Sequence, residues 1–138
     1  MTDAPTAPHP DPDARTLLVT LTGDDRPGVT KALFEAASTV GAEVLDLEQV
    51  VVRGHLALSV LLSPGPDENV LVDRITRAGH ALGMRVDIEA GRGDNAPRRT
   101  GRAAVVVMGA PLETHQVAAV AATIADHGAN IDRIRRLS

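Results

Sequence analysis

The 138-residue sequence contains no cysteine, no tryptophan, no tyrosine and a single phenylalanine. Without cysteine there are no disulfide bonds and no thiolate metal sites. With a single aromatic side chain, the protein lacks the usual surfaces on which nucleic-acid bases stack. The formal net charge of −4 also denies it the basic face that nucleic-acid binding requires. We therefore expect no nucleic-acid partner.

Long apolar runs are missing as well. No stretch approaches the roughly 20 apolar residues of a membrane span, and the N-terminus lacks the apolar core of a signal peptide. Residues 1–14 are acidic and proline-rich, with almost nothing to bury, so we expect a disordered tail. The sequence predicts a cytoplasmic protein with no membrane contact.

The sequence also lacks the usual catalytic motifs. It has no nucleophile elbow, no phosphate-binding Walker loop, no dinucleotide glycine pattern and no aspartyl-phosphate motif after an apolar strand. The five histidines show no metal-ligand spacing. We assign no catalytic residue and no metal site, which disfavours a small independent enzyme.

What the chain does have is regular apolar periodicity, since apolar residues make up 43% of it. Alternation predicts strands and an i, i+3, i+4 stripe predicts helices, and glycine and proline mark the boundaries. The expected elements are a strand over 15–22, a helix over 27–40, strands over 44–53 and 55–62 that meet at a hairpin, a helix starting near 67 and ending before Gly83, and a strand over 84–88.

This order of strand, helix, strand, strand, helix, strand fills residues 15–90. Right-handed crossovers convert it into an α+β, ferredoxin-like βαββαβ domain, with four antiparallel strands and both helices on one face. Residues 91–101 are glycine-rich and basic without apolar periodicity, so we expect a linker.

The pattern then restarts over residues 102–138. An apolar strand at 103–108 is followed by a helix at about 113–127, and Gly128-Ala129-Asn130-Ile131 repeats Gly41-Ala42-Glu43-Val44 at a spacing of 87 residues (128 − 41). We infer an internal repeat of which only the N-terminal βαβ half is present. Such a half exposes strand edges, so we expect either a fragment of a longer chain or completion by another subunit.

The loop after the first strand is the candidate binding site. Asp24 and Asp25 precede Pro27, which suits a first helical turn, and Gly28 permits close approach of another molecule. Carboxylates at this place can also serve simply as helix caps.

The βαββαβ order with Asp25-Arg26-Pro27-Gly28 at the strand-to-helix turn resembles the ACT domain. Together with Glu48-Gln49-Val50-Val51-Val52-Arg53-Gly54, Gly128-Ala129-Asn130-Ile131-Asp132 and the tandem spacing, it is similar to the N-terminal region of actinobacterial-type phosphoserine phosphatases. The resemblance covers residues 15–138. Glycine-cleavage repressors and formyltetrahydrofolate deformylases have a similar loop, so a stand-alone ACT regulator of either type is the alternative.

The resemblance implies a regulatory region that binds L-serine and supports a homodimer through its ACT units. It implies that catalysis, by a Mg²⁺-dependent phosphatase with an aspartate nucleophile, belongs to a part of the family absent from this chain, so no cofactor is expected here. Carried over by position, the ligand-binding residues are Asp25 and Gly28 in the loop, with Glu43 or Asn130 as the partner on strand two, and the pocket combines the loop with Asn130 of a neighbouring unit. His115 stands where the first unit has Gly28, which disfavours a site in the second loop.

Overall fold

The computed structural model describes residues 13–93 and 103–136, which belong to two compact units, residues 1–98 and 99–138. The expected disordered tail (apart from residues 13–14), the linker residues 94–101 and the last two residues lie outside the described part. Among the described residues, no helix is both long and apolar enough to cross a membrane.

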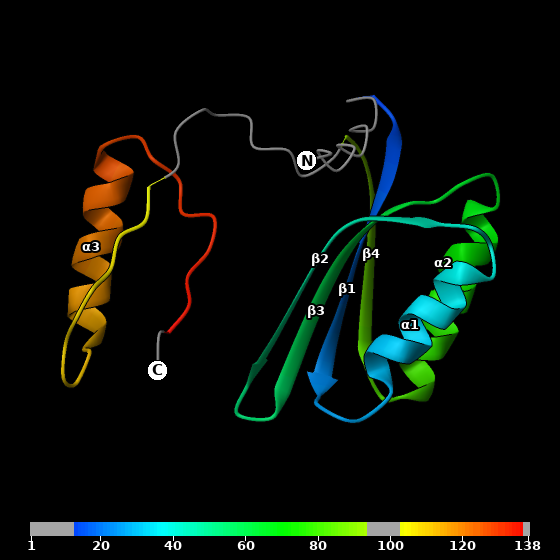
Figure 1. Ribbon diagram of the computed structural model, residues 1–138, viewed down its shortest axis with the longest axis horizontal. Helices are drawn as coiled ribbons and strands as arrows, with labels where there is room; N and C mark the ends of the chain where they lie inside the picture. Colours follow the sequence, from blue (N-terminus) through cyan, green and yellow to red (C-terminus); the bar gives the residue numbers. More distant parts are fainter. Residues whose placement is uncertain (1–12, 94–102, 137–138) are drawn as a thin grey trace, which may run out of the picture. The chain divides into compact units, whose positions relative to one another are not determined.

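The first unit is a four-stranded antiparallel sheet with two helices on one face (Figure 1). Its strand order is β2-β3-β1-β4, which is the ferredoxin-like arrangement expected from the sequence. In chain order the elements are β1 (Arg15–Asp24), α1 (Val29–Ser38), β2 (Glu43–Val52), β3 (His55–Ser63), α2 (Glu68–Ala81) and β4 (Arg85–Arg92).

The strand alternation sets the two faces of this sheet. Leu17, Val19 and Leu21 of β1 lie opposite Leu62, Val60 and Leu58 of β3, and all six are buried. The rest of the core comes from both helices, from β3 and from the residue before β4: Val29, Leu33 and Ala37 of α1, Leu71 and Ile75 of α2, Leu56 of β3, and Met84. The intervening residues of each strand form the outer face, which no helix of this unit covers (Figure 1).

Two glycine-containing turns place the loops. Arg53 (φ 49°) and Gly54 (φ 73°) both adopt left-handed conformations, the backbone of a type I′ hairpin, as the sequence predicted at this position. Gly28 has φ 93°, so it cannot continue a helix, and α1 begins after it at Val29. The helix was expected over about 27–40, so α1 begins two residues later and ends two residues earlier than expected.

The fourth strand is longer than predicted. The sequence indicated a strand over 84–88, whereas β4 extends to Arg92 and its ladder with β1 runs to the pair of Arg15 and Arg92. Residues 91 and 92, expected in the linker, therefore belong to the sheet. Backbone pairing with β1 decides this, because Gly91 and Arg92 carry no apolar pattern that the sequence could reveal.

The second unit contains one described helix, α3 (Thr114–Asp126). The expected strand over 103–108 and the expected strand after Gly128 are not assigned as strands among the described residues 103–136. The first unit gives the physical reason, because there β1 and β2 are not neighbours: β3 lies between them and pairs with both. A βαβ half therefore has no ladder partner within itself.

Candidate functional site

The first two residues of the loop between β1 and α1 are held by hydrogen bonds to neighbouring elements. The Asp25 backbone N–H donates to the Gly54 carbonyl at 2.7 Å, which ties the loop to the β2–β3 hairpin. The Arg26 guanidinium donates through Nη1 to the Leu82 carbonyl at 3.1 Å, which ties it to the C-terminal end of α2. Arg26 therefore has a structural role, and the loop conformation is set by two neighbouring elements.

The start of α1 is open. No side chain caps it, and its first backbone hydrogen bond runs from the Ala32 N–H to the Gly28 carbonyl at 2.9 Å. The N–H groups of residues 29–31 consequently have no partner within the helix. A Cβ built on Gly28 would meet no heavy atom within 4 Å, so space lies in front of this helix terminus. Open N–H groups and the helix dipole favour an anionic group such as a carboxylate here.

The equivalent terminus in the second unit is closed. Glu113 and Gln116 form a capping box at the start of α3, in which the Glu113 backbone N–H donates to Gln116 Oε1 at 2.9 Å. His115, 87 residues after Gly28, lies inside α3 and contacts Glu113 Oε2 at 3.0 Å through Nδ1. Of these two helix termini, only that of α1 therefore has backbone N–H groups without a side-chain cap.

The four residues expected at the site do not come together within one unit. Asp25 and Gly28 share the β1–α1 loop. Glu43 lies at the start of β2, opposite Ser63, whereas the loop lies at the other end of β3, near His55. The 10-residue helix α1 separates the two places by about 15 Å at 1.5 Å per residue. Asn130 belongs to the second unit. The contribution of Glu43 and Asn130 to one pocket stays a prediction.

Two polar residues beside the open terminus were not predicted. The Thr30 hydroxyl donates to Gln49 Oε1 at 2.7 Å, which joins the first turn of α1 to β2. Gln49 is opposite Leu58, so it interrupts the apolar parity of Leu47 and Val51 on the helix-facing side of β2. A polar residue at a strand position that alternation assigns to the apolar side, here Gln49, is the sequence signal that could have identified this contact.

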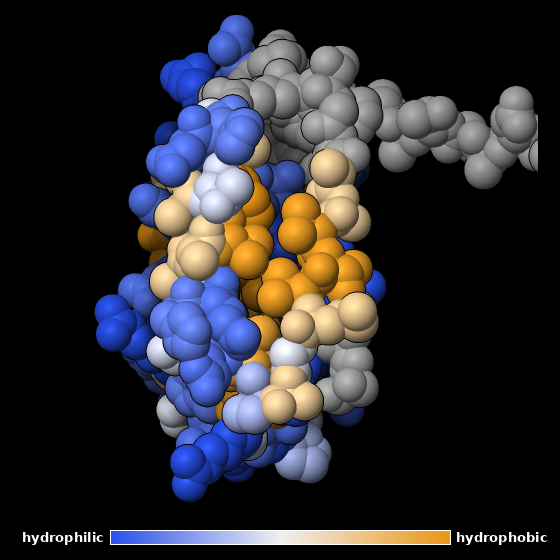
Figure 2. Space-filling model, turned by 90° about the vertical axis from the view of Figure 1, so that its left-hand side faces the viewer, coloured by the Kyte–Doolittle hydropathy of each residue, from blue (hydrophilic) through white to orange (hydrophobic). Residues whose placement is uncertain are grey.

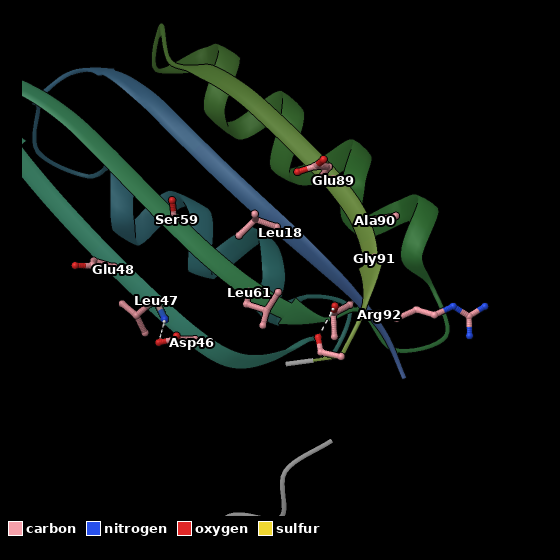
Figure 3. Close-up of a pocket in the computed structure, with 12 residues that line it drawn as sticks. Leu18, Asp46, Leu47, Glu48, Ser59, Leu61, Glu89, Ala90, Gly91 and Arg92 are labelled. Carbon is pink, nitrogen blue, oxygen red and sulfur yellow. Dashed lines mark hydrogen bonds between the residues drawn. The ribbon is translucent and has the colours of Figure 1, made fainter. Parts of the chain in front are cut away.

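A hollow of about 420 Å³ lies elsewhere, on the outer face of the sheet (Figure 3). Leu18 and Leu61 form its apolar floor, while carboxylates on β2 and β4 (Asp46, Glu48 and Glu89) line its sides. The Arg92 side chain points away from it (Figure 3). This lining disfavours an amino-acid carboxylate, and the hollow contains none of the expected site residues. No group of three or more His, Asp or Glu residues suited to a metal ion occurs in the described ranges 13–93 and 103–136.

Comparison with known proteins agrees with this architecture. Residues 15–89 match one ACT domain family and residues 102–138 match a second ACT domain family. Two solved structures share the fold. A protein of unknown function from Galdieria sulphuraria gives a TM-score of 0.59 at 22% identity, covering 83% of this chain and 65% of its own. A protein assigned as a glycine cleavage system transcriptional repressor gives a TM-score of 0.55 at 18% identity, covering 60% of this chain and 49% of its own.

Two sequence relatives are more similar. The chain is 42% identical over 128 residues to the phosphoserine phosphatase of Streptomyces coelicolor, and 42% identical over 127 residues to phosphoserine phosphatase SerB2 of Mycobacterium tuberculosis. These alignments cover 91% and 88% of this chain but only 31% of each relative. The chain therefore spans about a third of their length, and it is homologous to their N-terminal part. With a βαββαβ first unit and ACT matches over both units, the chain belongs to the ACT domain family.

Proposed function

We propose that this chain is the amino-acid-sensing region of a phosphoserine phosphatase and that it binds L-serine at the start of α1. The open α1 terminus is the observation that carries this proposal, because its N–H groups suit the carboxylate of an amino acid. Asp25, in the same loop, supplies a carboxylate for the ammonium group. The 42% identity to two phosphoserine phosphatases favours serine as the effector.

The polar pair at the same terminus supports a small hydroxylated ligand. Thr30 and Gln49 place a hydroxyl and an amide beside the first turn of α1, and both can hydrogen-bond a serine hydroxyl. Catalysis is not part of this proposal, since the chain covers only 31% of each phosphatase relative, and we place phosphate-ester hydrolysis in the portion with which it does not align. The proposed role is allosteric, through a homodimer of ACT units.

Isothermal titration calorimetry on the whole chain tests the ligand. We expect L-serine to bind with a Kd of roughly 10 μM to 1 mM, the range of few-atom ligands. Glycine lacks the side chain and should bind more weakly. A preference for glycine over serine would contradict the serine assignment and favour a regulator of the glycine-cleavage-repressor type.

Matched variants test the site. Asp25→Asn keeps the side-chain shape but removes the charge that would pair with the ammonium group, so serine affinity should fall about tenfold, or about 1.4 kcal/mol. The control is Asp24→Asn, one residue earlier at the end of β1, which should leave the affinity unchanged. Equal affinities for the two variants would remove Asp25 from the site.

Two further substitutions complete this test. Gly28→Ala adds a methyl group to the open space and should weaken binding, but φ 93° also strains an alanine, so its unfolding must be measured beside its affinity. Asn130→Ala and Glu43→Ala each test a predicted contributor from strand two. Serine affinity unchanged by both would restrict the site to the loop.

A further inference from the structure

Apolar side chains are exposed on both units of the chain. In the second unit Val106 and Met108 are exposed, and Figure 2 shows apolar side chains gathered at the centre of the surface on the side of α3. In the first unit Leu18, Val50 and Val52 are exposed on the outer face of the sheet, which no helix of this unit covers (Figure 1). The outer face also carries a regular arrangement of charges, and this arrangement indicates which kind of partner fits it.

The strand registers align the side chains of the outer face in rows that cross the sheet from β2 to β4. In each of two successive rows a carboxylate lies on each edge strand, and uncharged side chains lie on the two central strands. The members of the rows are Asp46, Leu61, Leu18 and Glu89 in one and Glu48, Ser59, Thr20 and Asp87 in the next. The outer face therefore has two acidic margins, Asp46 with Glu48 on β2 and Asp87 with Glu89 on β4, on either side of an uncharged centre.

The uncharged centre of this face is hollowed. The hollow of about 420 Å³ has Leu18 and Leu61 in its floor, between Glu48 on one side and Glu89 on the other (Figure 3). A second hollow, of about 380 Å³, shares Leu18 with the first and is lined further along β1 by Thr20. The two hollows together form a shallow trough between the acidic margins.

The dimensions of this trough match those of an α-helix. The edge strands β2 and β4 are three strand spacings apart, or about 14 Å, whereas a helix with its side chains is about 10–12 Å wide. Neighbouring carboxylates on one margin are two residues apart, or about 6.8 Å along the strand. Side chains at positions i and i+4 of a helix are about 6 Å apart. A helix with cationic side chains at i and i+4 on both flanks would therefore place one cation near each carboxylate.

We propose that the outer face of the first unit's sheet docks a basic amphipathic helix of another protein. The uncharged stripe of that helix packs on Leu18 and Leu61, and its lysine or arginine side chains extend over the margins to the carboxylates. Arg85 Nε lies 3.2 Å from Asp87 Oδ2, so one of the four carboxylates already has a cationic neighbour. With Arg85 included, the two rows still carry an excess of three negative charges, which a basic partner complements.

The same charges disfavour other occupants of this face. A second copy stacked on it face to face would bring carboxylates against carboxylates, and like charges that face each other are destabilising. Nucleic acids and anionic membrane surfaces are repelled for the same reason. The proposal is independent of the serine site, because neither row contains Asp25, Gly28, Thr30 or Gln49. Loss of serine binding and loss of helix docking are therefore separate outcomes.

Fluorescence anisotropy with a labelled synthetic peptide tests the docking. The probe is a helical peptide of about 18 residues, or about 27 Å, with a leucine and alanine stripe flanked by lysines at i and i+4. We expect the whole chain to bind it saturably with a Kd of about 1–100 μM, and more weakly when the salt concentration rises from about 0.05 M to 0.5 M. A peptide with glutamate in place of lysine should not bind. A peptide of the same composition in alternating order, which favours a strand, should bind more weakly.

Paired charge-removal variants locate the docking face. Glu48→Gln combined with Glu89→Gln removes one carboxylate from each margin, so peptide affinity should fall about fivefold. The matched control, Glu35→Gln combined with Asp73→Asn, removes two charges from the helices on the opposite face and should leave the affinity unchanged. Leu18→Thr keeps strand propensity but removes apolar contact from the floor, so it should also weaken binding. Urea unfolding checks that each variant is folded.

Four results would overturn the proposal. Equal affinities for the two double variants would show that the peptide is held by the overall negative charge and not by this face. No saturable binding up to about 1 mM peptide would show that the face does not accept a basic helix. Tighter binding of the alternating peptide would assign the face to an extended partner. A wild-type dimer in light scattering that Leu18→Thr dissociates would assign the face to a second copy of this chain.

Discussion

At the scale of single residues, close approach between helix and sheet depends on a glycine that the periodicity did not identify. Gly79 is one of the three buried residues of α2, beside Leu71 and Ile75. A Cβ built on Gly79 would lie 2.4 Å from Val86 Cγ2 and 3.3 Å from Leu21 Cδ2. The absence of a side chain at this position lets α2 rest directly on β1 and β4.

We expect Gly79→Ala to destabilise the first unit. Alanine stabilises a helix by about 1 kcal/mol relative to glycine, but displacing Val86 costs about 1–3 kcal/mol. The free energy of unfolding should therefore fall. Urea unfolding followed by far-UV circular dichroism measures it, since the chain has no tryptophan or tyrosine for fluorescence. The control is Gly91→Ala, where a Cβ meets nothing within 4 Å. If Val86→Ala fails to rescue Gly79→Ala, the steric explanation is wrong.

At the scale of elements, a charged pair joins the first strand to the second helix. Arg15 at the start of β1 donates through Nη2 to Glu68 Oε2 at 2.8 Å, and a second bond from Nε makes the contact bidentate. Glu68 is the first residue of α2, where a carboxylate also opposes the helix dipole. The pair therefore joins the first turn of α2 to the start of β1.

The same pair should give the first unit a dependence on acid pH. The Arg15 hydrogen bond, helped by its charge and opposed by desolvation, lowers the pKa of Glu68 below its ordinary value of 4.5. A carboxyl with a lowered folded-state pKa stabilises fully above its unfolded pKa, and this contribution is lost as the pH falls through the folded value. The free energy of unfolding, measured with urea, should fall between pH 7 and about pH 3 by less for Glu68→Gln than for the wild type.

The exposed ion pair of Asp73 and Arg77 on α2 provides the control for this effect. Asp73→Asn removes a carboxylate from the same helix, but a solvent-exposed pair contributes little. Its pH dependence should therefore resemble that of the wild type. If Glu68→Gln and Asp73→Asn behave alike, the Arg15 contact has no special role.

At the scale of the whole molecule, the two units differ in how they are stabilised. Every buried apolar residue in the described part lies between Leu17 and Met84, so the first unit contains its own core. The second unit has none among residues 103–136. The chain should therefore behave as an autonomous domain followed by a segment whose order depends on association.

We expect the isolated first unit, residues 1–98, to unfold at the same urea concentration as the full chain. The far-UV signal of α3 should instead rise with protein concentration in the full chain if its half-buried apolar residues are ordered by association, since no residue of α3 is buried. Circular dichroism over a dilution series distinguishes the two contributions. A single transition that shifts as a whole with concentration would show that the units are not independent.

The sequence by itself determined the fold of the first unit, because alternation in strands and the helical stripe are local properties that depend on side chains near one another in the chain. It also located the Arg53-Gly54 hairpin, where two left-handed residues are needed. The same signals, with the Asp25–Gly28 loop, were sufficient to identify the ACT family. They could not set the end of β4 at Arg92 or reveal the closeness of Gly79 to Val86, because both depend on residues distant in sequence.

The candidate site divides in the same way. The loop residues Asp25 and Gly28 were readable from the sequence, since turn chemistry is local. The tertiary structure decided that Glu43 lies a helix length from them, and that Thr30 meets Gln49 across the start of α1. It also explains why residues 103–136 contain a helix without strands, since a strand needs a neighbour for its backbone hydrogen bonds, and β1 and β2 of the first unit are not neighbours.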